Sequence, residues 1–184
     1  MFHTYRKVLV IVGIVFCLFS SVFAKYSGGS GEPNNPYRIA DANNLLVLAA
    51  DANDYSKAFV LVNDINLAGL TFTTAVIARD TDSSPGSGFN GTPFTGVFDG
   101  NNHSILNLTI NANENSNSSL GLFGCIGQGG LVKNLGIEDV NIILIAGYSS
   151  DFVGGLCGYN DYGSITNCYS TGSAAGNYYD AGGL

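Results

Sequence analysis

GGLCGYNDYGSITNCYS, at residues 154–170, is the stretch that decides the fold. Its first half places Gly-Leu-x-Gly around one large apolar residue, and looser copies of that half occur earlier, in TGVFDG at 95–100 and LGLFGC at 120–125. The residues at 182–184 match the start of a further copy. Repeats spaced by about 25 to 35 residues indicate stacked structural units.

A second element follows each copy: SILNLTI at 104–110, LVKNLGI at 131–137 and SITNCYS at 164–170. Its apolar positions fall at i, i+3 and i+5, with Ser170 in the last place of the third copy, instead of the strict alternation of a strand, and an Asn stands at the break. One extra residue reverses which face of a strand points inward, and Asn accepts a left-handed backbone more readily than most residues. Each element is therefore predicted to be a strand, a corner at Asn and another strand.

Aligning the copies predicts three columns of stacked side chains in a parallel β-solenoid. One column would hold Phe98, Phe123 and Cys157, and a second would hold Leu108, Leu135 and Cys168. The third would be a ladder of amides, about 4.8 Å apart, made by Asn107, Asn134 and Asn167.

The first 24 residues have the features of a signal peptide. Arg6 and Lys7 precede an apolar run at 8–19, and a V-x-A cleavage site follows at 22–24. The run is short for a membrane span, which needs about 20 apolar residues. We expect a secreted or cell-surface protein whose mature chain begins near Lys25 and has no membrane span. An uncleaved N-terminal anchor is the alternative.

Four regions are expected along the chain. They are the signal peptide at 1–24, a polar lead-in at 25–36, an N-terminal cap with the first strands at 37–93, and the repeated units at 94–184, of which the last is incomplete. Within the cap, the apolar stripe of IADANNLLVLAA predicts a short helix with Asp41 as its N-cap.

The charge of the chain excludes nucleic acid as a partner. Removing Arg6 and Lys7 from the seven basic residues leaves five against 14 acidic ones. A protein that binds nucleic acid needs a basic surface, and this composition does not supply one.

The cysteines are expected to be structural. The mature chain keeps Cys125, Cys157 and Cys168, an odd number, whereas a disulfide framework uses an even number. We expect small buried hydrophobic residues, with a Cys157–Cys168 bridge as the alternative.

The stretch VGGLCGYNDYGSITNCYSTGS at 153–173 resembles the GLUG motif, a bacterial repeat of large exported and surface proteins. FTGVFDGNNHSILNLTI at 94–110 is similar to the segment that leads into GLUG arrays, and residues 35–69 resemble the N-terminal cap of the same proteins. The resemblance implies an all-β fold, a right-handed parallel β-helix with a short helix-containing cap. It implies no single activity, and the His-Glu-x-x-His zinc motif of the GLUG-containing metalloproteases is absent.

No residues form a convincing catalytic set. Asp80, Asp82 and Asp99 are the nearest candidates, with Arg79 beside them, but each Asp fits ordinary turn chemistry. His103 follows Gly-Asn-Asn and is assigned to a solvated turn. We expect no cofactor, with weak Ca²⁺ binding near the junctions at Asp151, Asp161 and Asp180 as the open alternative.

Tyrosines are the stronger binding signal. The group comprises Tyr148, Tyr159, Tyr162, Tyr169, Tyr178 and Tyr179. All of them except Tyr169 are the candidates for stacking on sugar rings or anchoring a protein, although several could instead pack the edges of the units. We therefore expect a non-enzymatic extracellular or cell-surface repeat protein that acts in adhesion or in glycan or protein binding. The alternatives are a carbohydrate-active β-helix enzyme and a structural spacer of a larger surface protein.

The sequence stops at Ala181-Gly182-Gly183-Leu184, inside a strand that begins another unit. The last unit of a stack leaves an open edge unless something caps it. We expect further units of a longer chain, or another molecule, to cover this edge.

Overall fold

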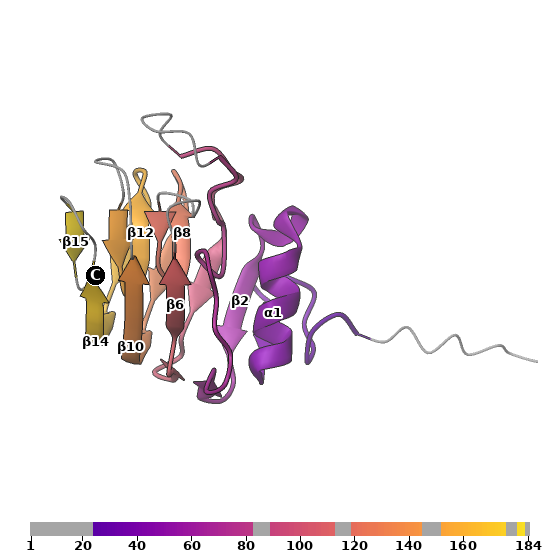
Figure 1. Cartoon of the computed structure of the whole chain (residues 1–184). Helices are drawn as coiled ribbons and strands as arrows, with labels where there is room; N and C mark the ends of the chain where they lie inside the picture. Colours follow the sequence, from indigo (N-terminus) through magenta and orange to yellow (C-terminus); the bar gives the residue numbers. More distant parts are fainter. Residues whose placement is uncertain (1–23, 83–88, 113–118, 145–151, 176–179, 183–184) are drawn as a thin grey trace, which may run out of the picture.

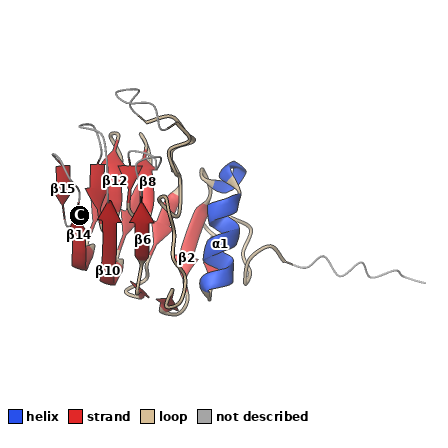
Figure 2. Ribbon diagram, viewed as in Figure 1, coloured by secondary structure: helices blue, strands red, loops and turns tan. Residues whose placement is uncertain are grey.

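The computed structural model describes residues 24–82, 89–112, 119–144, 152–175 and 180–182. Within them the chain forms parallel β-sheets and one α-helix, which lies at one end of the stacked strands (Figures 1 and 2). Residues 1–23, which hold nearly all of the predicted signal peptide, lie outside the described residues.

The elements follow one another in chain order. They are β1 (Tyr37–Ile39), α1 (Ala42–Ala50), a 3-10 turn (Ala52–Asp54), β2 (Ala58–Leu61), β3 (Ile65–Asn66), β4 (Val97–Asp99), β5 (Ser104–Leu106), β6 (Thr109–Ala112), β7 (Ser119–Leu120), β8 (Phe123–Ile126), β9 (Leu131–Lys133), β10 (Gly136–Leu144), β11 (Phe152–Gly154), β12 (Cys157–Asn160), β13 (Ser164–Thr166), β14 (Tyr169–Ala175) and β15 (Asp180–Gly182).

The strands pair in parallel in four sheets. Sheet 1 has the order β1-β2-β4-β9-β13, and sheet 2 the order β14-β10-β5-β3, with β6 also paired to β10. Sheet 3 is β15-β11-β7, and sheet 4 is β12-β8. The chain visits the sheets in the same order each time, for example β9, β10, β11 and β12. We call one such pass a rung.

The predicted corners at Asn are confirmed. Asn107, Asn134 and Asn167 each stand between two strands, with φ of 60°, 52° and 52°. This is the left-handed region, which Asn tolerates because its short side chain can hydrogen-bond locally. Each corner redirects the chain from one strand into the next.

The predicted columns of stacked side chains are partly wrong, because the first copy does not stack on the second in the register that alignment of the copies predicts. Phe123 pairs with Cys157 as predicted, but Phe98 pairs with Val132. Asn167 donates to Asn134 (2.9 Å), which donates to Asp99 (3.1 Å).

Asn107 lies at a different corner, where it donates to Asn66 (2.9 Å). The flanking pairs Leu106–Glu138 and Thr109–Asn141 place Asn107 opposite Asp139, which also has a positive φ of 55°. The same pairs place Leu108 opposite Val140, so Leu108 does not share the column of Leu135.

Aromatic side chains fill the space between the sheets. Phe98 stacks on Phe59 (ring centroids 6.4 Å apart) and meets Phe123 edge-on (5.5 Å), while Phe94 lies 5.1 Å from Phe123. All four rings are buried. Burying a Phe contributes about 1.5 to 3 kcal/mol, so these rings are a major source of the stability that holds the rungs together.

The predicted helix is α1, and Asp41 is its N-cap, accepting a hydrogen bond from the Asn44 backbone N–H (2.8 Å). Leu45 and Leu48 of α1 are fully buried and extend the core. The helix thus covers the end of the stack that β1 would otherwise leave open.

The left-handed corner at Asn134 is expected to be a measurable source of stability. Asn134→Ala removes two side-chain hydrogen bonds and forces Ala into a left-handed backbone, so unfolding should become easier by about 2 kcal/mol. Asn134→Gly removes the same bonds without the backbone strain and should cost about 1 kcal/mol. Chemical denaturation measures both, and equal losses in the two variants would contradict the role assigned to the backbone.

Candidate functional site

The outer face of sheet 2 carries a cluster of hydrogen-bonded polar and aromatic side chains. Ser104, Gly136 and Tyr169 are neighbours in the register of β5, β10 and β14. The next residues, Ile105 and Ile137, are fully buried. Because side chains alternate between the faces of a strand, Ser104 and Tyr169 lie on the outer face.

Gly136 leaves the space that the Tyr169 ring occupies. A Cβ at position 136 would lie 2.6 Å from the Cζ and Oη of Tyr169 and 2.6 Å from the Oγ of Ser104. Only glycine leaves room for the ring to lie across the strand. Tyr169 is nevertheless 49% exposed. Its ring therefore presents an aromatic surface to solvent, while its inner side packs on Gly136.

Glu138 fixes the hydroxyl end of that ring. Its Oε1 accepts hydrogen bonds from the Tyr169 Oη (2.5 Å) and the Ser104 Oγ (2.7 Å). These bonds, the one from Tyr169 first, lower the pKa of Glu138 because they favour the charged carboxylate. The site therefore combines an aromatic ring with an ionised carboxylate.

A second carboxylate adjoins the first through Ser104. Asp64 accepts a hydrogen bond from the Ser104 backbone N–H (2.9 Å) and lies 3.1 Å from the Nδ1 of His103. These contacts, the backbone one first, lower the pKa of Asp64. His103 thus has a defined carboxylate partner in addition to its place in a turn.

The chemistry of the two carboxylates suits hydrogen bonding better than proton transfer. A glycosidase needs one carboxyl group with a raised pKa to act as the acid. Both Asp64 and Glu138 have lowered pKa values instead. They are suited to accept hydrogen bonds from hydroxyl groups.

The predicted binding tyrosines are placed unevenly. Tyr159 is half-buried and stacks on Phe152, with ring centroids 5.3 Å apart. Tyr162 is 87% exposed at the corner between β12 and β13. Tyr148, Tyr178 and Tyr179 lie outside the described residues.

The candidate catalytic aspartates have separate structural roles. Asp80 is buried and accepts hydrogen bonds from the backbone N–H groups of Asp82 and Asn90 (both 3.1 Å). Asp99 pairs with Lys133 (3.1 Å) on sheet 1. Among the described residues, no group of three or more His, Cys, Asp or Glu could hold a metal ion. For the Ca²⁺ alternative, Asp151 and the Asp180 side chain lie outside this description.

The cysteines are free thiols. Cys125 and Cys157 are buried, and burial raises the pKa of each to about 12. Burial also raises the pKa of the half-buried Cys168. All three stay protonated at neutral pH and serve as packing residues, and the alternative Cys157–Cys168 bridge is not formed.

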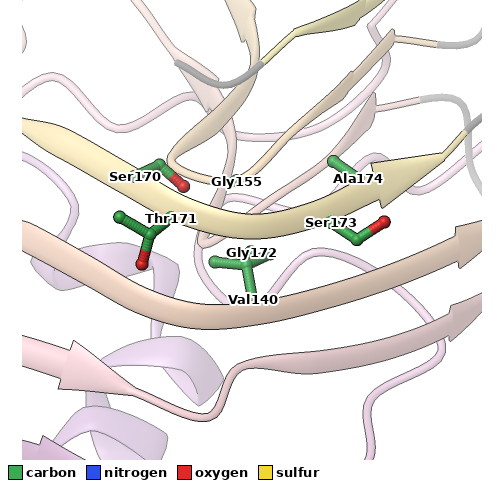
Figure 3. A pocket seen from close by; sticks show the side chains of 7 residues that line it. All are labelled: Val140, Gly155, Ser170, Thr171, Gly172, Ser173 and Ala174. Carbon is green, nitrogen blue, oxygen red and sulfur yellow. The ribbon is translucent and has the colours of Figure 1, made fainter.

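The described surface has several further hollows, among them a small one beside β10 and β14 and a larger one over sheet 1. The smaller, about 40 Å³, follows the irregular pairing of β10 with β14 and is lined by Val140, Gly155 and residues 170–174 (Figure 3). It has room for little more than water. The larger, about 300 Å³, lies over sheet 1 between Pro33, Pro36 and Leu131.

Of the site residues, Tyr169 belongs to the tyrosine group noted in the sequence, while Glu138, Ser104 and Asp64 are absent from the candidates predicted there. The four residues come from four different rungs, so no local motif contains them. One signal was available: Gly136 and Tyr169 occupy the same position after an Asn corner, two residues beyond Asn134 and Asn167.

Comparison with known proteins finds the GLUG motif at residues 153–175. The chain is 31% identical to "Halomucin" of Haloquadratum walsbyi over 155 residues, which are 80% of this chain and 2% of that protein. It is also 31% identical to a "Putative Gly-rich membrane protein" of Evansella cellulosilytica over 166 residues, 86% of this chain and 18% of that protein. No solved structure matches. None of the described helices has the length and apolar character to cross a membrane.

The pKa of Glu138 tests the geometry of the cluster. Tyr169→Phe deletes the hydroxyl that stabilises the carboxylate, so the pKa of Glu138 should rise towards its ordinary value. An NMR titration of the Glu138 side-chain carboxyl measures the change, and Tyr159→Phe is the control that should leave it unaltered. An unchanged value in Tyr169→Phe would show that the Tyr169–Glu138 bond does not form in solution.

Proposed function

Because the chain carries a GLUG motif, we propose that it is part of an extracellular or cell-surface repeat protein that binds glycans without catalysis. The proposed binding surface is the outer face of sheet 2 around Tyr169. The proposed role is adhesion, in which a rigid scaffold makes many weak contacts to a polysaccharide.

The proposed fold is a right-handed parallel β-helix, with α1 as part of its N-terminal cap. Its support is the recurring order of parallel strands through sheets 1 to 4. A connection that returns a chain to a parallel strand of the same sheet is right-handed in about 98% of cases. Such a scaffold presents flat faces on which sites from successive rungs align.

Export of the chain is proposed from the basic, apolar and small-residue segments of residues 1–24. In the structure, Lys25 bridges Asp51 and Asp54 (2.5 Å to each), and Tyr26 is buried. The residues directly after the proposed cleavage site are thus packed against the rest of the described chain. The name of the relative from Evansella places that protein in a membrane, which is compatible with a surface location here.

The Tyr169 ring is the single observation that carries the proposal. A pyranose ring has an apolar C–H face and a rim of hydroxyl groups. The exposed face of Tyr169 can stack on the former, while the carboxylates of Glu138 and Asp64 can accept hydrogen bonds from the latter. Because Gly136 and Glu138 hold the ring before any ligand arrives, binding loses little side-chain entropy.

The negative charge of the site restricts the kinds of glycan that can bind. The chain has a net charge of −7, and both carboxylates of the site are ionised at neutral pH. Acidic polysaccharides would be repelled. Neutral glycans and glycans with amino sugars fit the site best.

Binding of polysaccharides to the full chain tests the proposal. Retention is measured on an immobilised neutral β-1,3-glucan, on chitosan and on polygalacturonate. The first two should bind, and the third should not. Tyr169→Ala should weaken binding about tenfold, because one aromatic contact of this kind is worth about 1 kcal/mol or slightly more.

Ile143→Ala is the matched control, because Ile143 is exposed on β10, the strand of Gly136 and Glu138, away from Tyr169. It should bind as the unmodified chain does. Absence of binding to all three polysaccharides would refute the proposal and favour the structural-spacer alternative. Turnover of any of them would favour the enzyme.

A further inference from the structure

At one corner of the stack, two successive rungs form equivalent turns from different residues. The corner from sheet 4 into sheet 1 runs through residues 127–130 in one rung and 161–163 in the next, as the register pairs Ile126–Asn160 and Leu131–Ser164 require. Each corner contains a residue with positive φ: Gly129 at 88° and Tyr162 at 60°. One corner thus uses glycine for a left-handed backbone, and the next uses tyrosine.

A tyrosine at this position carries a conformational cost. A left-handed backbone brings Cβ close to the following carbonyl oxygen, which glycine avoids. A bulky residue with such a φ is a genuine outlier, and such outliers cluster at functional sites. Tyr162 is 87% exposed, so packing within the chain does not offset the strain.

Hydrogen bonds hold the backbone of this corner in place. Asn160 accepts a hydrogen bond from the Gly163 backbone N–H (3.0 Å) and donates one to the Gly163 carbonyl (3.3 Å). The Asp161 backbone N–H donates to the Ile126 carbonyl of the neighbouring rung (2.8 Å). The ring therefore projects from a turn that is fastened at both ends.

We infer that the corner at Asp161 and Tyr162 is a second sugar-binding subsite, for the same neutral or amino-sugar glycans as the Tyr169 site. This rests on the proposed function. Both places combine an exposed tyrosine with a carboxylate, Asp161 beside Tyr162 in the chain and Glu138 beside Tyr169 in space. The strain at Tyr162 is retained because the ring serves the ligand.

The two subsites lie at opposite ends of one strand. Tyr162 precedes β13 and Tyr169 follows it, so sheet 1 separates them. Seven residues of extended chain span at most about 25 Å, which bounds the length of polymer needed to reach both. A long polymer or a glycan-coated surface can engage both at once, and its apparent affinity then exceeds that of either subsite.

Tyr162→Gly tests the inference because its effects on stability and on binding are opposite. Glycine relieves the left-handed strain, so the melting temperature of the full chain should rise by about 2 to 4 °C. Retention on chitosan and on the β-1,3-glucan should fall about tenfold or more, because the polymer loses one of two linked contacts.

Gly129→Ala is the matched control at the equivalent corner. No atom lies within 4 Å of the added Cβ, so only the backbone strain changes: the melting temperature should fall and retention should stay the same. A Tyr162→Gly chain that binds both polymers as tightly as the unmodified chain overturns the second subsite, while loss of binding in Tyr169→Ala keeps the proposed function. An unmodified chain that binds neither polymer refutes both.

Discussion

The structure depends on residues that accept a left-handed backbone where one parallel strand gives way to the next. Asn134 and Asn167 fill this role at one corner, and Gly129 and Tyr162 at another. Asn107 stands between β5 and β6, opposite Asp139, whose positive φ marks the equivalent bend within β10. Each corner redirects the chain so that the next strand can pair with the rung before it. Parallel stacking, the buried aromatic core and the aligned outer faces all follow from these turns.

The proposed sites are consequences of that stacking. Tyr169 lies over Gly136 because the two follow equivalent Asn corners in adjacent rungs, and Glu138 meets Ser104 because β10 pairs with β5. Neither contact exists within a single repeat. The surface chemistry of the protein is therefore set by the register between repeats, and the composition of one repeat does not determine it.

Much of the fold could be predicted from sequence, because local patterns carry it. The broken alternation predicts the strand–Asn–strand unit, and the stripe after Asp41 predicts α1. The register of the first copy could not be predicted, because its corner has four residues, 100–103, where the next rung has two, 134–135. Asn107 then aligned with the wrong Asn. Asp64, Ser104 and Glu138 were missed for the same reason, since the site residues come from separate rungs.

Disulfide trapping across the rungs tests the register most directly. Parallel neighbours lie about 4.8 Å apart, within reach of a disulfide. In a Cys168→Ala background, oxidation should join Leu106→Cys to Glu138→Cys, which the structure pairs. It should not join Leu106→Cys to Lys133→Cys, the pair that alignment of the repeats favours. Peptide mapping that finds the second bridge and not the first would contradict the stacking and the site built on it.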